Sequence, residues 1–242
     1  MKRRLLAMVT IVVMLMLLLP AAHADGYSTW DPGNQAYMYN DVHYGVVICT
    51  KMNVRNKPST SGTTYGSIRN GQPVKVLGIT QDGNFYLLDL DSCGIPSDQY
   101  YGYAKASLIK IDPEYLIASR LLNLYATPWG DGLKNGEQTN RVFLVISEAN
   151  GWYAVQATES TPGTAFIRMK DAPENYNGRY VVTWDTDLYD DSTMTKYSTV
   201  KRFTVGSLIG VSGDYSRMVF NEGTTNEFYA WVNSQYVAPV IN

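Results

Sequence analysis

The segment MNVRNKP at residues 52–58 decides how the chain folds, because a segment of the same design, LNLYATP, follows at residues 122–128. Both place an apolar residue, an asparagine and a second apolar residue ahead of three variable positions and a proline. A basic residue and an Asn-Gly pair follow each segment in the same order, at residues 69–71 and 134–136. Ordered self-similarity of this kind predicts an internal repeat.

The second half of each copy predicts strands. Apolar runs come first, and the aromatic pairs Phe85-Tyr86 and Trp152-Tyr153 come next. Because side chains alternate between the two faces of a strand, Tyr86 and Tyr153 share one face, while Phe85 and Trp152 point the other way. The apolar runs lie at residues 74–77 and 142–146, and each copy closes on a small-aromatic-aliphatic triplet, at residues 102–104 and 165–167.

A third copy follows the same order with fewer of the marker residues. Residues 186–189 stand in for the asparagine segment, residues 199–202 lack the Asn-Gly pair, and the closing triplet is at residues 230–232. Copies of about 65 residues account for nearly all of the chain beyond its N-terminus. The expected organisation is a signal peptide (1–24), an N-terminal segment (25–43) and three modules (44–112, 113–172 and 173–242).

The fold class predicted from this pattern is all-β, with tandem small β-barrels and little helix. Short apolar stretches bounded by Gly, Asn, Asp, Ser and Thr are typical of short strands joined by turns. Closing each small sheet into a barrel removes the exposed edges that would otherwise pair with other chains. A single helix is expected at most, at residues 113–122.

The first copy resembles the bacterial SH3-like domain, in its MNVR-x-x-P segment, its Gly71 turn and its Gly-Tyr-Ala triplet. In the second copy the run GWYAV at residues 151–155 is similar to the same family, although Tyr125 stands where the family has arginine. The third copy lacks both that arginine and the proline. The resemblance implies small barrels that are non-catalytic binding modules, often directing wall peptidases to peptidoglycan peptides and in other cases mediating protein contacts.

The N-terminus has the three parts of a secretory signal peptide. Residues 2–4 are basic, residues 5–19 are apolar, and Ala22 and Ala24 are small residues ahead of the expected cleavage point after Ala24. The apolar run, of about 15 residues, is shorter than the roughly 20 that a membrane-spanning helix needs. We therefore expect a secreted protein, extracellular or associated with the cell wall, and not in the membrane after cleavage.

Charge and histidine content exclude several classes of function. Cleavage removes Lys2, Arg3 and Arg4 and lowers the net charge from −2 to −5, which disfavours nucleic acid as a partner. His43 is then the only histidine, so we expect no zinc site, no metal, no cofactor and no catalytic residues. A cysteine hydrolase would need Cys49 or Cys93 beside His43, and neither cysteine starts a helix.

Other residues that could carry chemistry have structural explanations. The acidic pairs at residues 89–91 and 190–191 are interpreted as turn formers rather than calcium ligands. Cys49 and Cys93 belong to one copy of an exported chain, so a disulfide is expected. It would close a loop of about 44 residues and stabilise the fold by about 3–4 kcal/mol. Two buried thiols are the alternative.

Aromatic residues are the candidate ligand-binding groups, because the chain has 19 Tyr and five Trp. Two interpretations stay open for them: grooves that bind a ligand, and surfaces that pack one barrel against the next. The function expected is binding of cell-wall peptidoglycan peptides or a cell-envelope protein, and the alternative is an extracellular structural or protein-interaction module. The candidates form three clusters: Tyr65, Phe85, Tyr100 and Tyr101; Tyr125, Trp129 and Trp152; and Tyr189, Tyr197 and Tyr215.

Overall fold

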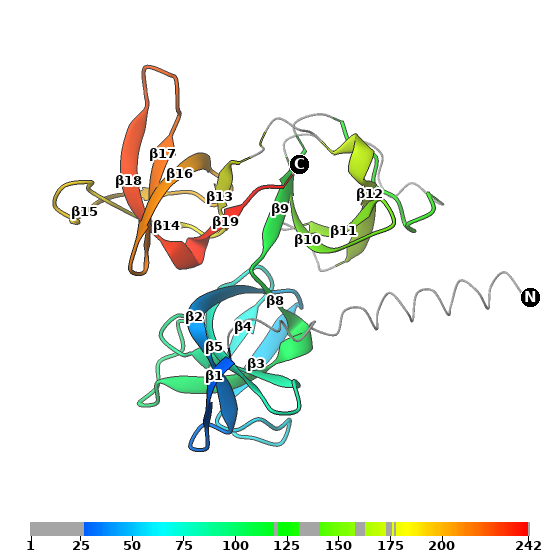
Figure 1. Ribbon diagram of the computed structural model, residues 1–242, viewed down its shortest axis with the longest axis vertical. Coiled ribbons are helices and arrows are strands. Elements are labelled where there is room, and N and C mark those ends of the chain that lie inside the picture. Colours follow the sequence, from blue (N-terminus) through cyan, green and yellow to red (C-terminus); the bar gives the residue numbers. More distant parts are fainter. Residues whose placement is uncertain are drawn as a thin grey trace, which may run out of the picture. The chain divides into compact units, whose positions relative to one another are not determined.

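The computed structural model describes residues 27–118, 121–130, 141–157, 163–172, 176 and 178–241. The predicted signal peptide, residues 1–24, lies outside the described residues. The described part is all-β, with three sheets and three short 3₁₀ helices, which confirms the predicted fold class (Figure 1). None of the described helices is long and apolar enough to cross a membrane.

The chain divides into two compact units, which we describe separately. The first unit comprises residues 1–43, 51–68 and 75–109, and the second comprises residues 44–50, 69–74 and 110–242. The helix expected at residues 113–122 is wrong, because residues 114–117 form a strand, β9 (Glu114–Ile117). Two of its residues, Tyr115 and Ile117, are buried in a core of aliphatic side chains, and this packing outweighs any local helical preference.

The first sheet has eight strands in the order β1-β2-β5-β6-β7-β3-β4, with β8 paired to β2 (blue to green in Figure 1). A short helix, η1 (Ala106–Leu108), precedes β8. The strands are β1 (Tyr27–Asp31), β2 (Ala36–Val47), β3 (Lys51–Arg55), β4 (Thr64–Arg69), β5 (Pro73–Thr80), β6 (Phe85–Asp89), β7 (Tyr101–Lys105) and β8 (Ile109–Ile111).

The hairpin β1–β2 extends this sheet by two strands that the repeat pattern does not predict. Ala36 packs with Leu87 and Tyr103 in a small core on the second face of β6. The sheet approaches the hairpin so closely that a Cβ on Gly78 would lie 2.4 Å from the carbonyl oxygen of Tyr37. As a result, Leu87 is buried together with its neighbours in β6, and the predicted alternation of faces does not appear as alternating burial there.

The second sheet has the order β12-β11-β10-β9, and β11 keeps the predicted alternation from Trp152 to Val155. Tyr153 and Val155 face the core with Ile167, while Trp152 is only half-buried. Asn150 and Gly151 both have positive φ and join β10 to β11 in a two-residue turn, a conformation that Asn-Gly adopts readily. The remaining elements are β10 (Val142–Ala149), β11 (Trp152–Ala157), β12 (Thr164–Arg168) and η2 (Met169–Asp171).

The third sheet has seven strands in the order β15-β14-β18-β17-β16-β13-β19. Its core contains Leu188, Met218, Phe220 and Val232. Its elements are β13 (Tyr180–Val182), β14 (Thr186–Tyr189), β15 (Lys196–Val200), β16 (Val205–Ser212), β17 (Tyr215–Phe220), β18 (Phe228–Asn233), η3 (Ser234–Tyr236) and β19 (Val237–Pro239).

Inside the second unit, a further core joins residues of the second and third sheets. Tyr115 forms a parallel bridge with Val240, and the backbone N–H of Ile241 donates to the carbonyl oxygen of Tyr115 at 2.8 Å. Leu144 and Val181 pack in the same core. The members are aliphatic apart from tyrosine and phenylalanine at three positions, and no aromatic residue of the three candidate clusters belongs to it.

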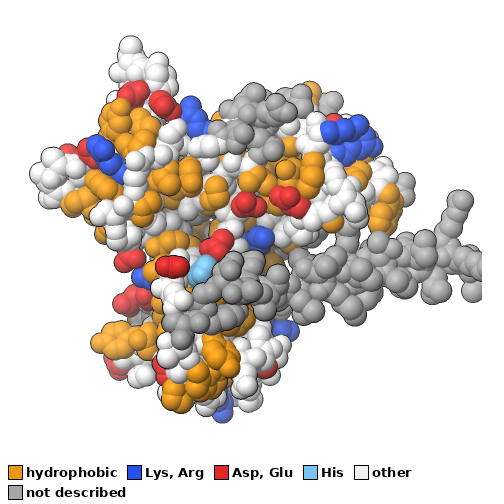
Figure 2. Space-filling view, in the orientation of Figure 1, with side chains coloured by type: hydrophobic (Ala, Val, Ile, Leu, Met, Phe, Trp, Pro, Cys, Tyr) orange, Lys and Arg blue, Asp and Glu red, His pale blue; other side chains and the backbone are white. Residues whose placement is uncertain are grey.

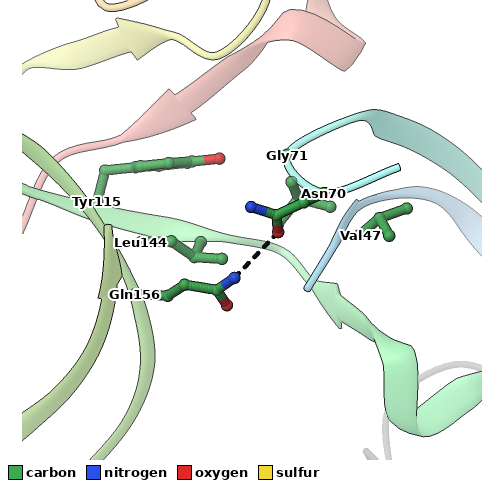
Figure 3. Close-up of a pocket in the computed structure, with 7 residues that line it drawn as sticks. Val47, Asn70, Gly71, Tyr115, Leu144 and Gln156 are labelled. Carbon is green, nitrogen blue, oxygen red and sulfur yellow. Dashed lines mark hydrogen bonds between the residues drawn. The ribbon is translucent and has the colours of Figure 1, made fainter. Parts of the chain in front are cut away.

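A buried amide completes this unit. Gln156, on β11, is 6% exposed, and its Nε2 atom donates to Oδ1 of Asn70 at 3.0 Å (Figure 3). Asn70 and Gly71 form the Asn-Gly turn of the first copy, where Gly71 has a φ of +76°. Gln156 and Asn70 border a cavity of about 10 Å³ together with Tyr115 and Leu144. The hydrogen bond between the two side chains satisfies the buried amide of Gln156.

Candidate binding site

The second sheet brings Trp152, Arg168 and Tyr125 together. Trp152 and Arg168 are half-buried, and Tyr125 is buried. Trp152 and Arg168 are cross-strand partners on β11 and β12 (Figure 1). Tyr125 bridges to Phe166, two residues before Arg168, through two backbone hydrogen bonds of 2.9 Å. The Tyr125 and Trp152 rings meet edge to face, with centroids 5.2 Å apart. We call these three residues the Tyr125–Trp152–Arg168 cluster.

The guanidinium group of Arg168 lies over both rings. Its central carbon is 5.0 Å from the centre of the Tyr125 ring and 5.3 Å from that of Trp152, which is the range of cation–π attraction. In the described part of the chain, no carboxylate pairs with Arg168. The rings therefore orient the cation without neutralising its charge.

A glycine is required where the chain passes over this cluster. Gly130 has a φ of +85°, a conformation that disfavours other residues. A Cβ placed there would lie 3.3 Å from Nη2 of Arg168 and within 4 Å of both rings. The neighbouring side chain, Trp129, is 44% exposed. Three predicted residues, Tyr125, Trp129 and Trp152, thus lie on or beside one cluster.

The third sheet has a similar pair of aromatic rings, and an arginine of this sheet is neutralised by a carboxylate. The rings of Tyr189 and Tyr215 meet edge to face at 5.3 Å. On β17, two residues after Tyr215, Arg217 makes a two-pronged ion pair with Asp191, whose pKa it lowers. Figure 2 shows acidic and basic side chains beside hydrophobic ones over this sheet. Tyr197 is 52% exposed and stands on the edge strand β15.

In the first sheet, the four predicted aromatic residues do not form one cluster. Phe85 packs against the core of Ala36, Leu87 and Tyr103, under the β1–β2 hairpin. Tyr65 is half-buried, whereas Tyr100 and Tyr101 are exposed and lie 6.2 Å apart. Within the described residues, no ring contact joins Tyr65 or Phe85 to that pair. The β1–β2 hairpin packs against the outward face of β6, on which Phe85 was a candidate for either a ligand groove or a contact between barrels.

The two cysteines, His43 and Asp190 are further residues that could carry chemistry, and each has contacts that suit a structural role. Cys93 is buried and Cys49 is half-buried, and the structure has no bond between their sulfur atoms. The disulfide between them stays a prediction. Burial raises the pKa of the Cys93 thiol to about 12. His43 lies in β2 with its ring 4.6 Å from that of Tyr39. Asp190 accepts hydrogen bonds from the Ser192 hydroxyl and from the backbone N–H groups of Thr193 and Ser192, which lower its pKa to about 2.

Comparison with known proteins supports the resemblance of the first copy to bacterial SH3 domains. Residues 50–110 match the model of the bacterial SH3 domain. The match covers the MNVR-x-x-P segment and the Gly-Tyr-Ala triplet, and it does not extend to the second and third copies. Bacterial SH3 domains are commonly modules that bind the cell wall. No protein of curated function matches the chain.

Arg168 is the main site residue that the sequence analysis missed. Its signal was present, because it lies two residues after the aromatic position of a closing triplet. Alternation places such a residue on the same face as that aromatic, and strand pairing then sets it opposite Trp152. Identifying it required knowing that β11 and β12 are adjacent and in this register.

Proposed function

We propose that the chain is a secreted, non-catalytic binding protein whose SH3-like modules attach it to the peptides of cell-wall peptidoglycan. One observation carries the proposal: Arg168 presents a cation on two aromatic rings and has no carboxylate partner in the described part of the chain. The predicted signal peptide at residues 1–24 supports export, and the bacterial SH3 match at residues 50–110 supports a wall ligand.

Wall peptides suit this cluster chemically. They are short, carry free carboxylates and present methyl groups and amides. The edge N–H groups of a guanidinium bind a carboxylate in two-pronged fashion, while its flat faces stack on aromatic rings. Trp129, with 44% of its surface exposed, is an apolar surface next in sequence to Gly130, which contacts the cluster. Recognition is local in this proposal, because the mature chain is acidic overall.

The test is sedimentation of the secreted protein with purified peptidoglycan from several species. Trp152→Ala removes one of the rings under Arg168 and is expected to weaken binding by about tenfold or more. Tyr229→Ala is the matched control, since Tyr229 is an exposed aromatic, 46% accessible, on another sheet. Absence of binding to every wall preparation, or equal loss in both variants, contradicts the proposal.

A second candidate is an extracellular structural or protein-interaction module without a wall ligand. The shared aliphatic core of the second unit favours it, because a continuous core makes a rigid body rather than separate flexible domains. Limited proteolysis measures that rigidity. A protein that resists cutting and captures an envelope protein, yet leaves peptidoglycan untouched, fits this second function.

A further inference from the structure

The first unit contains a groove of about 480 Å³ that none of the predicted site residues lines. One wall comes from the β1–β2 hairpin, a second from the loop after β3, and a third from the end of β5 and the turn that follows it. The groove exists because the hairpin joins this sheet. Its lining residues are Trp30, Gln35, Pro58, Thr80, Gln81 and Asp82.

Trp30 supplies the flat apolar surface of this groove. Its side chain is 39% exposed, which is unusual for so large an apolar ring. The ring is supported by Tyr37, with centroids 5.0 Å apart and planes inclined by 59°. Support from one side and exposure on another give the indole a fixed position from which to contact a ligand.

Two side-chain amides of the groove can both donate to and accept from a ligand. Gln35 and Gln81 are exposed, and within the described residues their side chains make no hydrogen bond. Asp82 is already engaged, since its Oδ1 accepts from the Thr80 hydroxyl at 2.6 Å and from the backbone N–H of Asn84 at 3.0 Å. Its Oδ2 accepts from Nδ2 of Asn84 at 2.7 Å. The carboxylate therefore holds the turn.

Hydrogen bonds within the protein hold the two turns that carry Gln81 and Gln35. Asp82 organises the turn that carries Gln81, as described above. Asp31 organises the hairpin turn that carries Gln35, because its Oδ1 accepts from the backbone N–H groups of Gly33 and Asn34 at 2.8 and 3.2 Å. The hydroxyl of Tyr103 also donates to the carbonyl oxygen of Asn34. A preformed site binds with little ordering cost.

We infer that this groove binds an uncharged saccharide. The six lining residues include no lysine or arginine, so an anionic ligand finds no counter-charge there. An indole accommodates the C–H face of a sugar ring, and a glutamine amide both donates to and accepts from sugar hydroxyls. The volume lies in the range of small-molecule sites. An amine is less suited, since the one carboxylate present is committed to its turn.

Isothermal titration of the purified protein with chitotetraose, a neutral tetramer of N-acetylglucosamine, and with cellotetraose tests the inference. Trp30→Ala is expected to weaken saccharide binding by about tenfold or more, and Gln81→Ala by roughly fivefold. Tyr229→Ala is the control for an exposed aromatic outside the groove. Because Gln81 is exposed, its variant tests the site even where Trp30→Ala disturbs the hairpin.

Three results overturn the inference: no saccharide binds, Trp30→Ala binds as the unchanged protein does, or choline and lysine peptides bind at Trp30 in place of sugars. The inference stands apart from the proposed function, which concerns wall peptides at another sheet. Arg168→Met is expected to leave chitotetraose binding unchanged, and Trp30→Ala to leave binding of sugar-free wall peptides unchanged. Either proposal can therefore fail while the other holds.

Discussion

Trp152 and Arg168 are cross-strand partners on β11 and β12, and the guanidinium carbon of Arg168 lies 5.3 Å from the centre of a Trp152 ring. In the third sheet, Arg217 has Trp231 as its cross-strand partner but is ion-paired with Asp191. The two arginines therefore differ in whether a carboxylate of the described chain neutralises their charge.

This difference predicts different results for two matched substitutions. Arg168→Met is expected to weaken binding of sugar-free wall peptides by about tenfold or more, because a hydrogen bond to a charged group contributes roughly 1.5–3 kcal/mol. Arg217→Met removes a cation that Asp191 already neutralises, and binding should change less than about threefold. Titration calorimetry of both variants measures this. Equal losses would mean that Arg168 acts only through net charge.

Alanine substitutions at two glycines distinguish the effect of backbone strain from the effect of crowding at the candidate site. Gly130 and Gly151 have φ values of +85° and +79°, but a Cβ on Gly151 meets nothing within 4 Å. We expect alanine at either position to lower the free energy of unfolding by about 1–2 kcal/mol, because both carry the left-handed conformation.

Peptide binding should distinguish the two variants. Gly130→Ala places a methyl group against Arg168 and should weaken binding, whereas Gly151→Ala should retain it. Urea unfolding gives the stability, and calorimetry gives the affinity. If Gly130→Ala retains full affinity, the cluster is not the peptide site.

The buried thiol of Cys93 predicts a loss of stability in alkaline solution. Its pKa is raised to about 12 by burial, whereas an unfolded cysteine titrates near about 8.5. The unfolded chain therefore releases this proton at lower pH than the folded chain. The free energy of unfolding should fall by about 1–2 kcal/mol between about pH 8.5 and pH 10.

Substitution of each cysteine checks the source of that loss. Cys93→Ala should remove this part of the pH dependence, and Cys49→Ala, at a half-buried position, should retain it. Urea unfolding with and without a reducing agent also tests the predicted disulfide between the two residues. If the disulfide forms, the unchanged protein should lose stability in alkaline solution only after reduction. The Cys49→Ala variant cannot form the bond, so it should lose stability in alkaline solution even without a reducing agent.

The fold class was predictable from the sequence because strand patterns are local. The GWYAV run places Tyr153 and Val155 in the core and leaves Trp152 outside, as alternation requires. The same argument did not give the burial of Leu87, since the hairpin that covers it begins at Tyr27, about 60 residues earlier in the chain, and carries none of the repeat markers.

The candidate site was predictable in part for the same reason. Tyr125, Trp129 and Trp152 were identified as aromatic residues at repeat positions, and alternation placed Trp152 on the outer face. Arg168 was not identified, because its role depends on the register between β11 and β12. For Phe85 the sequence left a ligand groove and a contact between barrels open, and it did not predict the packing of this residue against the β1–β2 hairpin.

By itself, the sequence determined an all-β chain with a repeated strand order, because turn residues and a two-residue period act within a few positions. The tertiary structure alone decided that Arg168 lies on two rings, that the β1–β2 hairpin covers Phe85, and that Trp30 and Gln81 line one groove. These relationships join residues from different strands and turns. Long-range strand pairing sets them, and no local pattern encodes which strands will meet.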